Sequence, residues 1–215
     1  MRRLLFFIHL KKNMNRNFLL VVVIVLKTSF SFAQDFEFKS DYNVLNKSMI
    51  QNFFNFERIN FSQNTITSNI IKNKNYLINL KEYKNGQIIK TTCLVKSDNQ
   101  SYAIIDSTKF NFNILGKRTG DNFEIELFFK RFSTKKYDLK LISKFKNDYI
   151  LKEIELKQGD LKLSKPFIFL LLTTPEYFKD GSASWCEVAA NETPEKIYEK
   201  NKIPHFFVFE MTILD

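Results

Sequence analysis

Glycine, proline, cysteine and histidine are all scarce in this chain of 215 residues, which contains 5 Gly, 4 Pro, 2 Cys and 2 His. So little glycine and proline excludes collagen-like and linker-like chains. His205 is the single histidine after residue 33, which excludes sites there that need two or more histidine ligands. The two cysteines, Cys93 and Cys186, are too far apart in sequence to form a CxxC pair. We therefore expect neither a metal nor a cofactor.

Acidic residues are missing from the first 33 positions, although six of the 33 basic residues lie there. Within this segment, Phe18 to Leu26 forms an unbroken apolar run, and Ser31-Phe32-Ala33 provides small residues two positions apart. A basic head, a short apolar stretch and a small-residue site are typical of a secretory signal peptide. We expect residues 1–33 to be removed after Ala33, and Met14 is an alternative start.

A transmembrane anchor is the alternative interpretation of the apolar run. Its nine residues would span only about 14 Å as a helix, roughly half of a bilayer core. We therefore expect no stable transmembrane segment after leader removal, and a chain exported to the periplasm or beyond the cell by a bacterium. The remaining 27 basic and 23 acidic residues give a net charge of only +4, so we expect no nucleic-acid partner.

An oxidising compartment allows disulfides to persist, and the even number of cysteines predicts one bridge between Cys93 and Cys186. The alternative is two separate buried thiols, because the sequence contains no information about the distance between the two Cα atoms.

Proline is absent from Gln34 to Lys165, and all four prolines follow. We interpret residues 34–215 as a single β-rich domain in which 166–215 is a looped, proline-bearing closing segment. The apolar stretches Pro166 to Leu172 and Phe206 to Leu214 are hydrophobic at consecutive positions. Such stretches predict strands covered on both sides, and hence central positions in a sheet.

Apolar residues recur with a period of two between residues 76 and 156, which predicts short strands. Asn85-Gly86 is a favoured turn pair and predicts a hairpin over 76–95. No segment here is long enough for a crossover helix, so the pairing should be antiparallel. Residues 60–75 are expected to form a loop or a weak strand, and Gly116 to Asn122 a loop. The other expected strands are 102–106, 110–114, 123–129, 137–141 and 149–156.

Three segments carry helix signals. Leu45, Met49, Phe53 and Phe56 share one helical face within an N-terminal helix expected over about 40–58. Thr174-Pro175-Glu176 and Thr193-Pro194-Glu195 each combine a hydroxyl cap, a first-turn proline and an acid. They predict two short C-terminal helices, which end by Gly181 and near Lys200. The predicted fold class is mainly β (α+β), a single antiparallel, curved β-meander or barrel-like sheet of about six to nine strands.

Cys186 and His205 are the candidates for a nucleophile and its general base. Catalysis would require the imidazole within hydrogen-bond reach of the sulfur and a third group to orient it. Glu187 disfavours this interpretation, because a neighbouring negative charge raises the pKa of a thiol. A disulfide half-cystine or a core thiol is the alternative role for Cys186.

Basic residues gather around one turn, interleaved with Phe128, Phe129, Phe132 and Tyr137. Such a patch can attract anionic lipid headgroups or acidic glycans. The alternative is an ordinary solvated hairpin, in which lysines at a sheet edge block aggregation. The members of this basic patch are Lys130, Arg131, Lys135, Lys136 and Lys140.

These observations favour an exported, non-enzymatic binding module of the bacterial envelope that holds an apolar or lipid-like ligand. The alternating, phenylalanine-rich strands are its main positive support, since a curved apolar sheet can enclose such a ligand. One alternative is a structural or assembly protein that binds another envelope protein. The other is a hydrolase that depends on Cys186 and His205.

Overall fold

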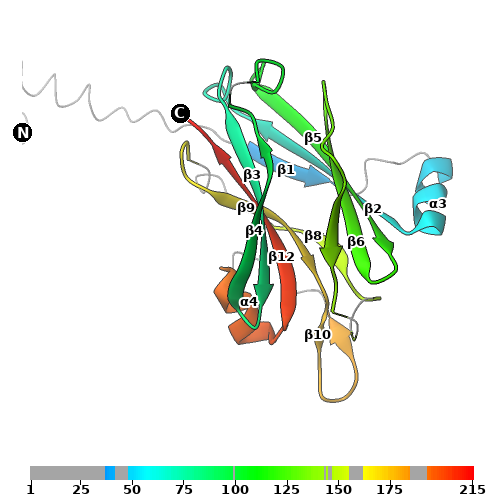
Figure 1. Cartoon of the computed structure of the whole chain (residues 1–215). Coiled ribbons are helices and arrows are strands. Elements are labelled where there is room, and N and C mark those ends of the chain that lie inside the picture. Colours follow the sequence, from blue (N-terminus) through cyan, green and yellow to red (C-terminus); the bar gives the residue numbers. More distant parts are fainter. Residues whose placement is uncertain are drawn as a thin grey trace, which may run out of the picture. The chain divides into compact units, whose positions relative to one another are not determined.

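The computed structural model describes one compact unit within Gln34–Asp215. The strands of this unit form two five-stranded antiparallel sheets and one two-stranded sheet (Figure 1). The described residues are 37–41, 48–98, 100–142, 144, 147–154, 162–184 and 193–215. The predicted leader, including its apolar run, lies outside these residues.

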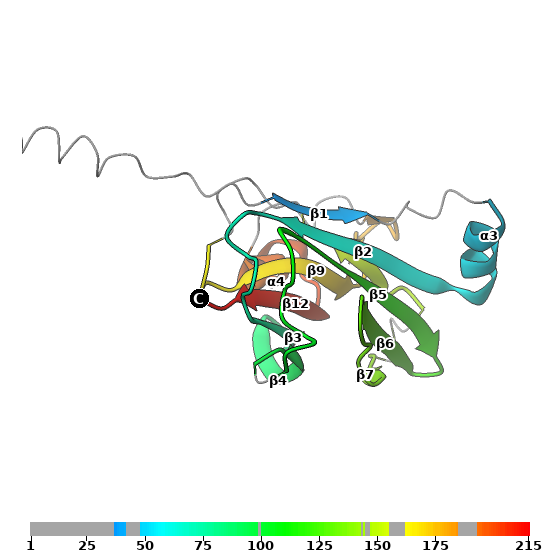
Figure 2. The ribbon, with the colours of Figure 1, turned by 90° about the horizontal axis from the view of Figure 1, so that it is seen from above.

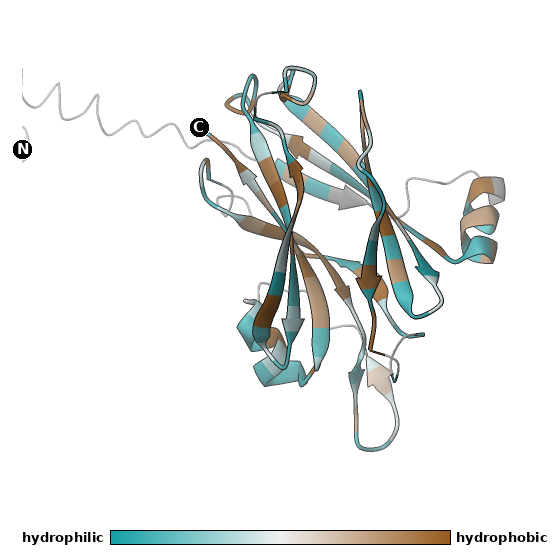
Figure 3. Ribbon diagram, in the orientation of Figure 1, coloured by the Kyte–Doolittle hydropathy of each residue, from teal (hydrophilic) through white to brown (hydrophobic). Residues whose placement is uncertain are grey.

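The first sheet has the strand order β1-β2-β5-β6-β7, and every neighbouring pair is antiparallel. Its inward positions alternate with outward ones, as the banded colouring of β5 and β6 shows (Figure 3). Its strands are β1 (Glu37–Asp41), β2 (Ile59–Thr67), β5 (Lys109–Thr119), β6 (Asn122–Phe129) and β7 (Tyr137–Lys140).

The second sheet has the order β4-β3-β12-β9-β8, again antiparallel throughout. The expected hairpin is confirmed as β3 and β4, joined by Asn85 and Gly86, which both have positive φ. The strands of this sheet are β3 (Tyr76–Lys84), β4 (Gln87–Lys96), β8 (Ile150–Glu153), β9 (Phe167–Thr173) and β12 (His205–Ile213).

The two five-stranded sheets face each other as layers of a β-sandwich (Figure 2). Side chains from both sheets form the main core, in which Phe112 of β5 meets Phe169 of β9 with ring centroids 5.6 Å apart. The prediction of an antiparallel, mainly β fold is confirmed. The prediction of one meander or barrel-like sheet is wrong, because the chain crosses from β2 to the opposite layer for β3 and β4 and then returns for β5.

The C-terminal strand β12 lies at the centre of the second sheet, between β3 and β9. Phe207 and Phe209 face the main core, whereas Phe206 and Val208 face a smaller cluster on the outer side. Helix α4 (Pro194–Asn201) contributes Ile197 to that cluster. The two-sided apolar pattern therefore predicted the central position of β12 correctly. Among the described residues after 165, β9 and β12 pair with each other inside the second sheet.

Two of the expected helices are present within the described residues. α3 (Ser48–Glu57) is shorter than the expected 40–58, because Ser40 and Asp41 belong to β1 instead. α4 begins at Pro194 after Thr193, as expected, and ends where Lys202 adopts a left-handed conformation. No helix in the described part of the chain has the length and apolarity that crossing a membrane requires.

The prediction of a helix after Thr174 is wrong, since this segment forms the hairpin of β10 (Glu176–Tyr177) and β11 (Ala183–Ser184). The turn contains Gly181 with φ +85°, and the Asp180 carboxylate accepts hydrogen bonds from the Ser182 amide and hydroxyl. Asp-Gly is a hairpin signal that competes with the Thr-Pro-Glu helix signal.

Three further differences concern strand boundaries. Residues 60–75, expected as a loop or a weak strand, contain most of β2, which pairs with both β1 and β5. The expected strand 102–106 consists of turns and irregular backbone. The expected loop from Gly116 is instead the end of β5, which turns only at Gly120, where φ is +61°.

Candidate functional site

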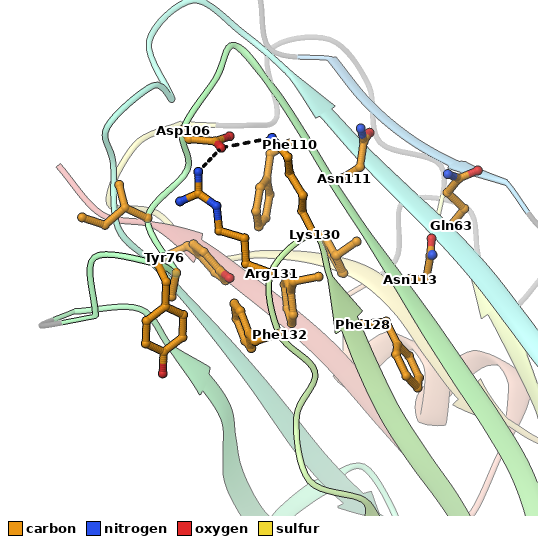
Figure 4. Close-up of a pocket in the computed structure, with 15 residues that line it drawn as sticks. Gln63, Tyr76, Asp106, Phe110, Asn111, Asn113, Phe128, Lys130, Arg131 and Phe132 are labelled. Carbon is orange, nitrogen blue, oxygen red and sulfur yellow. Dashed lines mark hydrogen bonds and ion pairs between the residues drawn. The ribbon is translucent and has the colours of Figure 1, made fainter.

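A cavity of about 330 Å³ opens at the end of the sandwich where β3 and β5 begin and β6 ends (Figure 4). Part of its wall is the connection between β4 and β5, which includes Tyr102, Ala103 and Asp106. Residues of β2 and the connection after β6 complete the lining, so four strands and two connections meet around one space. A cavity of this size is at the lower end of the range for small-molecule sites.

Aromatic rings form the inner wall of this cavity. Phe129 is their centre: its ring stacks on Phe132 with centroids 4.5 Å apart and lies 5.8 Å from the ring of Tyr76. The ring of Phe110 also belongs to this group, and its centroid lies 4.8 Å from that of the Tyr76 ring. These side chains come from both sheets and from the connection after β6. The wall is therefore a product of the sandwich rather than of one hairpin.

Amide side chains from the outward face of the first sheet also line the cavity. Gln63, Asn113 and Phe128 lie in one row across β2, β5 and β6, because the register pairs Gln63 with Asn113 and Asn113 with Phe128. Asn111 lies in the next row and accepts a hydrogen bond from the Thr65 hydroxyl. The lining thus combines an apolar side with groups that can form hydrogen bonds.

Two cations and one carboxylate stand at the opening of the cavity (Figure 4). Asp106 Oδ2 lies 2.9 Å from Arg131 Nη2 and 3.3 Å from Lys130 Nζ. Both cations belong to the predicted basic patch. Their side chains remain 47% and 77% exposed, so each can still contact a solute.

The other patch residues lie apart from the cavity lining. Lys135 Nζ stands 5.3 Å from the centroid of the Tyr137 ring, and Lys136 Nζ pairs with Glu124 Oε1 at 2.8 Å. Lys140 is exposed at the end of β7. Two of the five basic residues thus line the cavity, and the other three do not.

The hydroxyl of Tyr76 is buried and has no hydrogen-bond partner. Its side chain lines the cavity and is completely inaccessible to solvent. Burial raises the pKa of Tyr76, so the group stays a neutral donor and acceptor. Buried tyrosine hydroxyls usually find a partner. The unpaired Tyr76 hydroxyl is an exception to this rule, and it lies where solvent does not reach it.

His205 lies at the other end of β3 and β12, in a buried hydrogen-bonded group. Its Nδ1 is 2.6 Å from the Tyr149 hydroxyl, and its Nε2 is 3.0 Å from Glu82 Oε1. A carboxylate can only accept, so Nε2 carries the hydrogen and Nδ1 accepts from Tyr149. Burial lowers the pKa of His205, while Glu82 opposes that effect.

This arrangement leaves neither nitrogen of His205 free to take a proton from a thiol. The predicted partner Cys186 lies outside the described residues, so the Cys186–His205 site stays a prediction. Cys93 has a free, exposed thiol on β4, and its predicted bridge to Cys186 likewise stays untested. Among the described residues, no group of three or more His, Cys, Asp or Glu side chains is placed to hold a metal ion.

Sequence reasoning identified Lys130, Arg131 and His205 but missed their partners. The sequence pattern places Asp106 in a strand, and it connects neither Tyr76 nor Tyr149 with a site. No local spacing connects these residues, because Asp106 and Arg131 are 25 positions apart and Tyr149 and His205 are 56 apart.

Comparison with models of protein families, with curated proteins and with solved structures found no match to this chain.

Proposed function

We propose that this chain is an exported, non-enzymatic binding module that holds an apolar or lipid-like small molecule in the cavity beside Tyr76. One observation carries the proposal: aromatic rings from both sheets wall a cavity of about 330 Å³, whose lining also includes amide side chains. A core selected for packing alone is filled to high density and leaves few polar groups unpaired. A site that binds an organic molecule combines apolar walls with a few polar groups.

The aromatic wall suits a flat or chain-like apolar body. Phe110, Phe129 and Phe132 present rings from one sheet and its following connection, opposite Tyr76 of the other sheet. Rings of this kind contribute both buried area and favourable ring geometry to binding.

A second candidate function, assembly with another envelope protein, is supported by exposed apolar side chains away from the cavity. Phe53 and Phe56 on α3 are 55% and 84% exposed, and Ile88 and Ile89 lie exposed on the edge strand β4. Exposed apolar groups and unpaired strand edges are features of protein contact surfaces.

The ligand proposal is tested with N-phenyl-1-naphthylamine, a neutral apolar dye that fluoresces when it is buried. We expect saturable binding of one dye per chain. Phe132→Ala removes the ring stacked on Phe129 and should weaken binding roughly threefold to tenfold, since an aromatic contact contributes about 0.5–1.5 kcal/mol. Phe178→Ala is the matched control, because Phe178 is an exposed phenylalanine on the β10–β11 hairpin.

Absence of dye binding, or equal loss in both variants, would contradict a site in this cavity. Native mass spectrometry of the protein purified from its own export route adds an independent measurement. A heavier species that loses a small apolar molecule on denaturation supports the proposal.

Export itself is tested by the intact mass of the protein expressed with residues 1–33 in a bacterial host. We expect the mature chain to begin at Gln34 and to be recovered outside the cytoplasm. A chain that retains residues 1–33 in the cytoplasm would contradict the export proposal. The proposal about the cavity would be unaffected.

A further inference from the structure

The opening of the cavity has more positive than negative charge. Lys130, Arg131 and Asp106 are the charged residues in the lining, so the two cations share a single carboxylate. Both contacts go to the same oxygen, Asp106 Oδ2, at 3.3 Å from Lys130 Nζ and 2.9 Å from Arg131 Nη2. One carboxylate oxygen thus occupies the place between two cations, and one positive charge is left uncompensated.

The connection between β4 and β5 holds this carboxylate in place. The Ile105 amide donates to the Lys74 carbonyl oxygen at 3.1 Å, and the Asn73 amide donates to the Ile105 carbonyl oxygen at 2.7 Å. These bonds fix the backbone directly before Asp106. The backbone position of Asp106 therefore follows from backbone pairing, and its carboxylate reaches the two cations from there.

We infer that the ligand is an anionic amphiphile whose carboxylate, sulfonate or phosphate group binds Lys130 and Arg131 while its apolar body lies against the aromatic wall. This inference rests on the proposed function of the cavity and names the ligand class. In the free protein, Asp106 takes the place of the anionic group and keeps the two cations at the opening. The bound ligand competes with Asp106 for them.

Charge and geometry favour this class over two others. A cationic amphiphile would meet a net positive opening and is disfavoured. A long polyanion needs a continuous row of cations, but Lys136 is paired with Glu124, and Lys135 lies against Tyr137. A single anionic group attached to an apolar body fits both features of the cavity.

Two dyes with the same skeleton test the inference. N-phenyl-1-naphthylamine is neutral, and 1-anilinonaphthalene-8-sulfonate has the same two ring systems and one sulfonate. Dissociation constants for both are measured by fluorescence with the full mature chain, at low and high salt. Because the sulfonate dye also binds partly unfolded proteins, each variant must show the near-UV circular dichroism of the wild type and bind one dye per chain.

We expect the wild type to prefer the sulfonate dye at low salt and to lose that preference as salt screens the opening. Asp106→Asn frees both cations, so the ratio of sulfonate to neutral affinity should rise about fivefold, the upper range for an exposed ion pair. Lys130→Gln with Arg131→Gln should lower the same ratio by at least that factor. Asp98→Asn is the matched control, since Asp98 pairs with Lys96 at 2.6 Å, outside the cavity lining.

The outcomes separate the two proposals. Binding of the neutral dye with an affinity ratio that neither Asp106→Asn nor the double glutamine variant changes would overturn the ligand class and leave the cavity function standing. Failure of both dyes to bind would overturn the proposed function and the ligand class together.

Discussion

The Tyr149 hydroxyl lies 2.6 Å from Nδ1 of His205, and both side chains are at least 95% buried. Burial raises the pKa of Tyr149 to about 12 and lowers that of His205, so both groups are neutral near pH 7. The pair joins the connection before β8 to the first residue of β12. It therefore ties the edge of the second sheet to its centre.

Replacement of Tyr149 by Phe should destabilise the protein by about 1–3 kcal/mol, because Nδ1 of His205 would be left buried without a donor. Urea unfolding measures the change. Tyr177→Phe is the matched control: its hydroxyl donates to Asp148 Oδ2 at 2.5 Å, but Tyr177 is 43% exposed, so solvent can replace the bond. Equal effects of the two substitutions would contradict a structural role for the buried pair.

Stability should fall as the pH drops below about 6.5. The pKa of His205 is lower in the folded chain than its ordinary value of 6.5. Between these two values the unfolded chain binds a proton that the folded chain does not, so acid favours unfolding by up to about 1.4 kcal/mol per pH unit.

The measurement is the free energy of unfolding of the wild type and of His205→Gln between about pH 8 and about pH 5.5. The difference in free energy of unfolding between the two proteins should become smaller as the pH falls, because only the wild type contains the titrating imidazole. A difference that is constant over this range would show that His205 does not titrate as described.

Gly116 lies beneath the Phe123 ring, and a Cβ at this position would overlap atoms of that buried ring. Gly116→Ala should therefore cost about 1–3 kcal/mol through overpacking. Phe123→Leu removes the overlapping ring atoms, so the double variant should be more stable than the sum of the two single losses predicts. Additive losses in a double-mutant cycle would exclude this contact as the cause.

Tyr76→Phe should leave the ligand-free protein as stable as the wild type or stabilise it by about 1 kcal/mol, because an unpaired buried hydroxyl is removed. Tyr76→Ala should lower the free energy of unfolding by several kcal/mol, because the buried ring is removed. Thermal or urea unfolding distinguishes the two. A clear loss of stability in Tyr76→Phe would reveal a hydrogen bond at this hydroxyl.

Cys93 should react with iodoacetamide in the native, reduced protein, since its thiol is exposed on β4. The predicted bridge to Cys186 is tested on the exported protein by intact mass before and after reduction. Protection of Cys93 together with the loss of two hydrogens would establish the bridge, and alkylation of Cys93 in the exported protein would exclude it.

The sequence determined those features that depend on neighbours along the chain. Alternation at Phe123, Ile125 and Leu127 is enough to define a strand with one dry face, and Asn85-Gly86 is enough to define a turn. Consecutive apolar residues at Phe206 to Phe209 require cover on both sides, which only a central strand provides. These signals act over two to ten residues, and the period of a strand makes them readable.

Tertiary structure decided which strands share a sheet and what they enclose. Ile59 to Thr67 pairs with a strand more than 40 residues later, and Tyr76 meets Phe129 across the two layers. Asp106 reaches Arg131 only because a turn-rich connection is placed at the end of β6. Local periodicity is identical for one curved sheet and for two facing sheets, because both bury one face of each strand. The choice between them, and with it the cavity, depends on contacts between distant residues that no local pattern records.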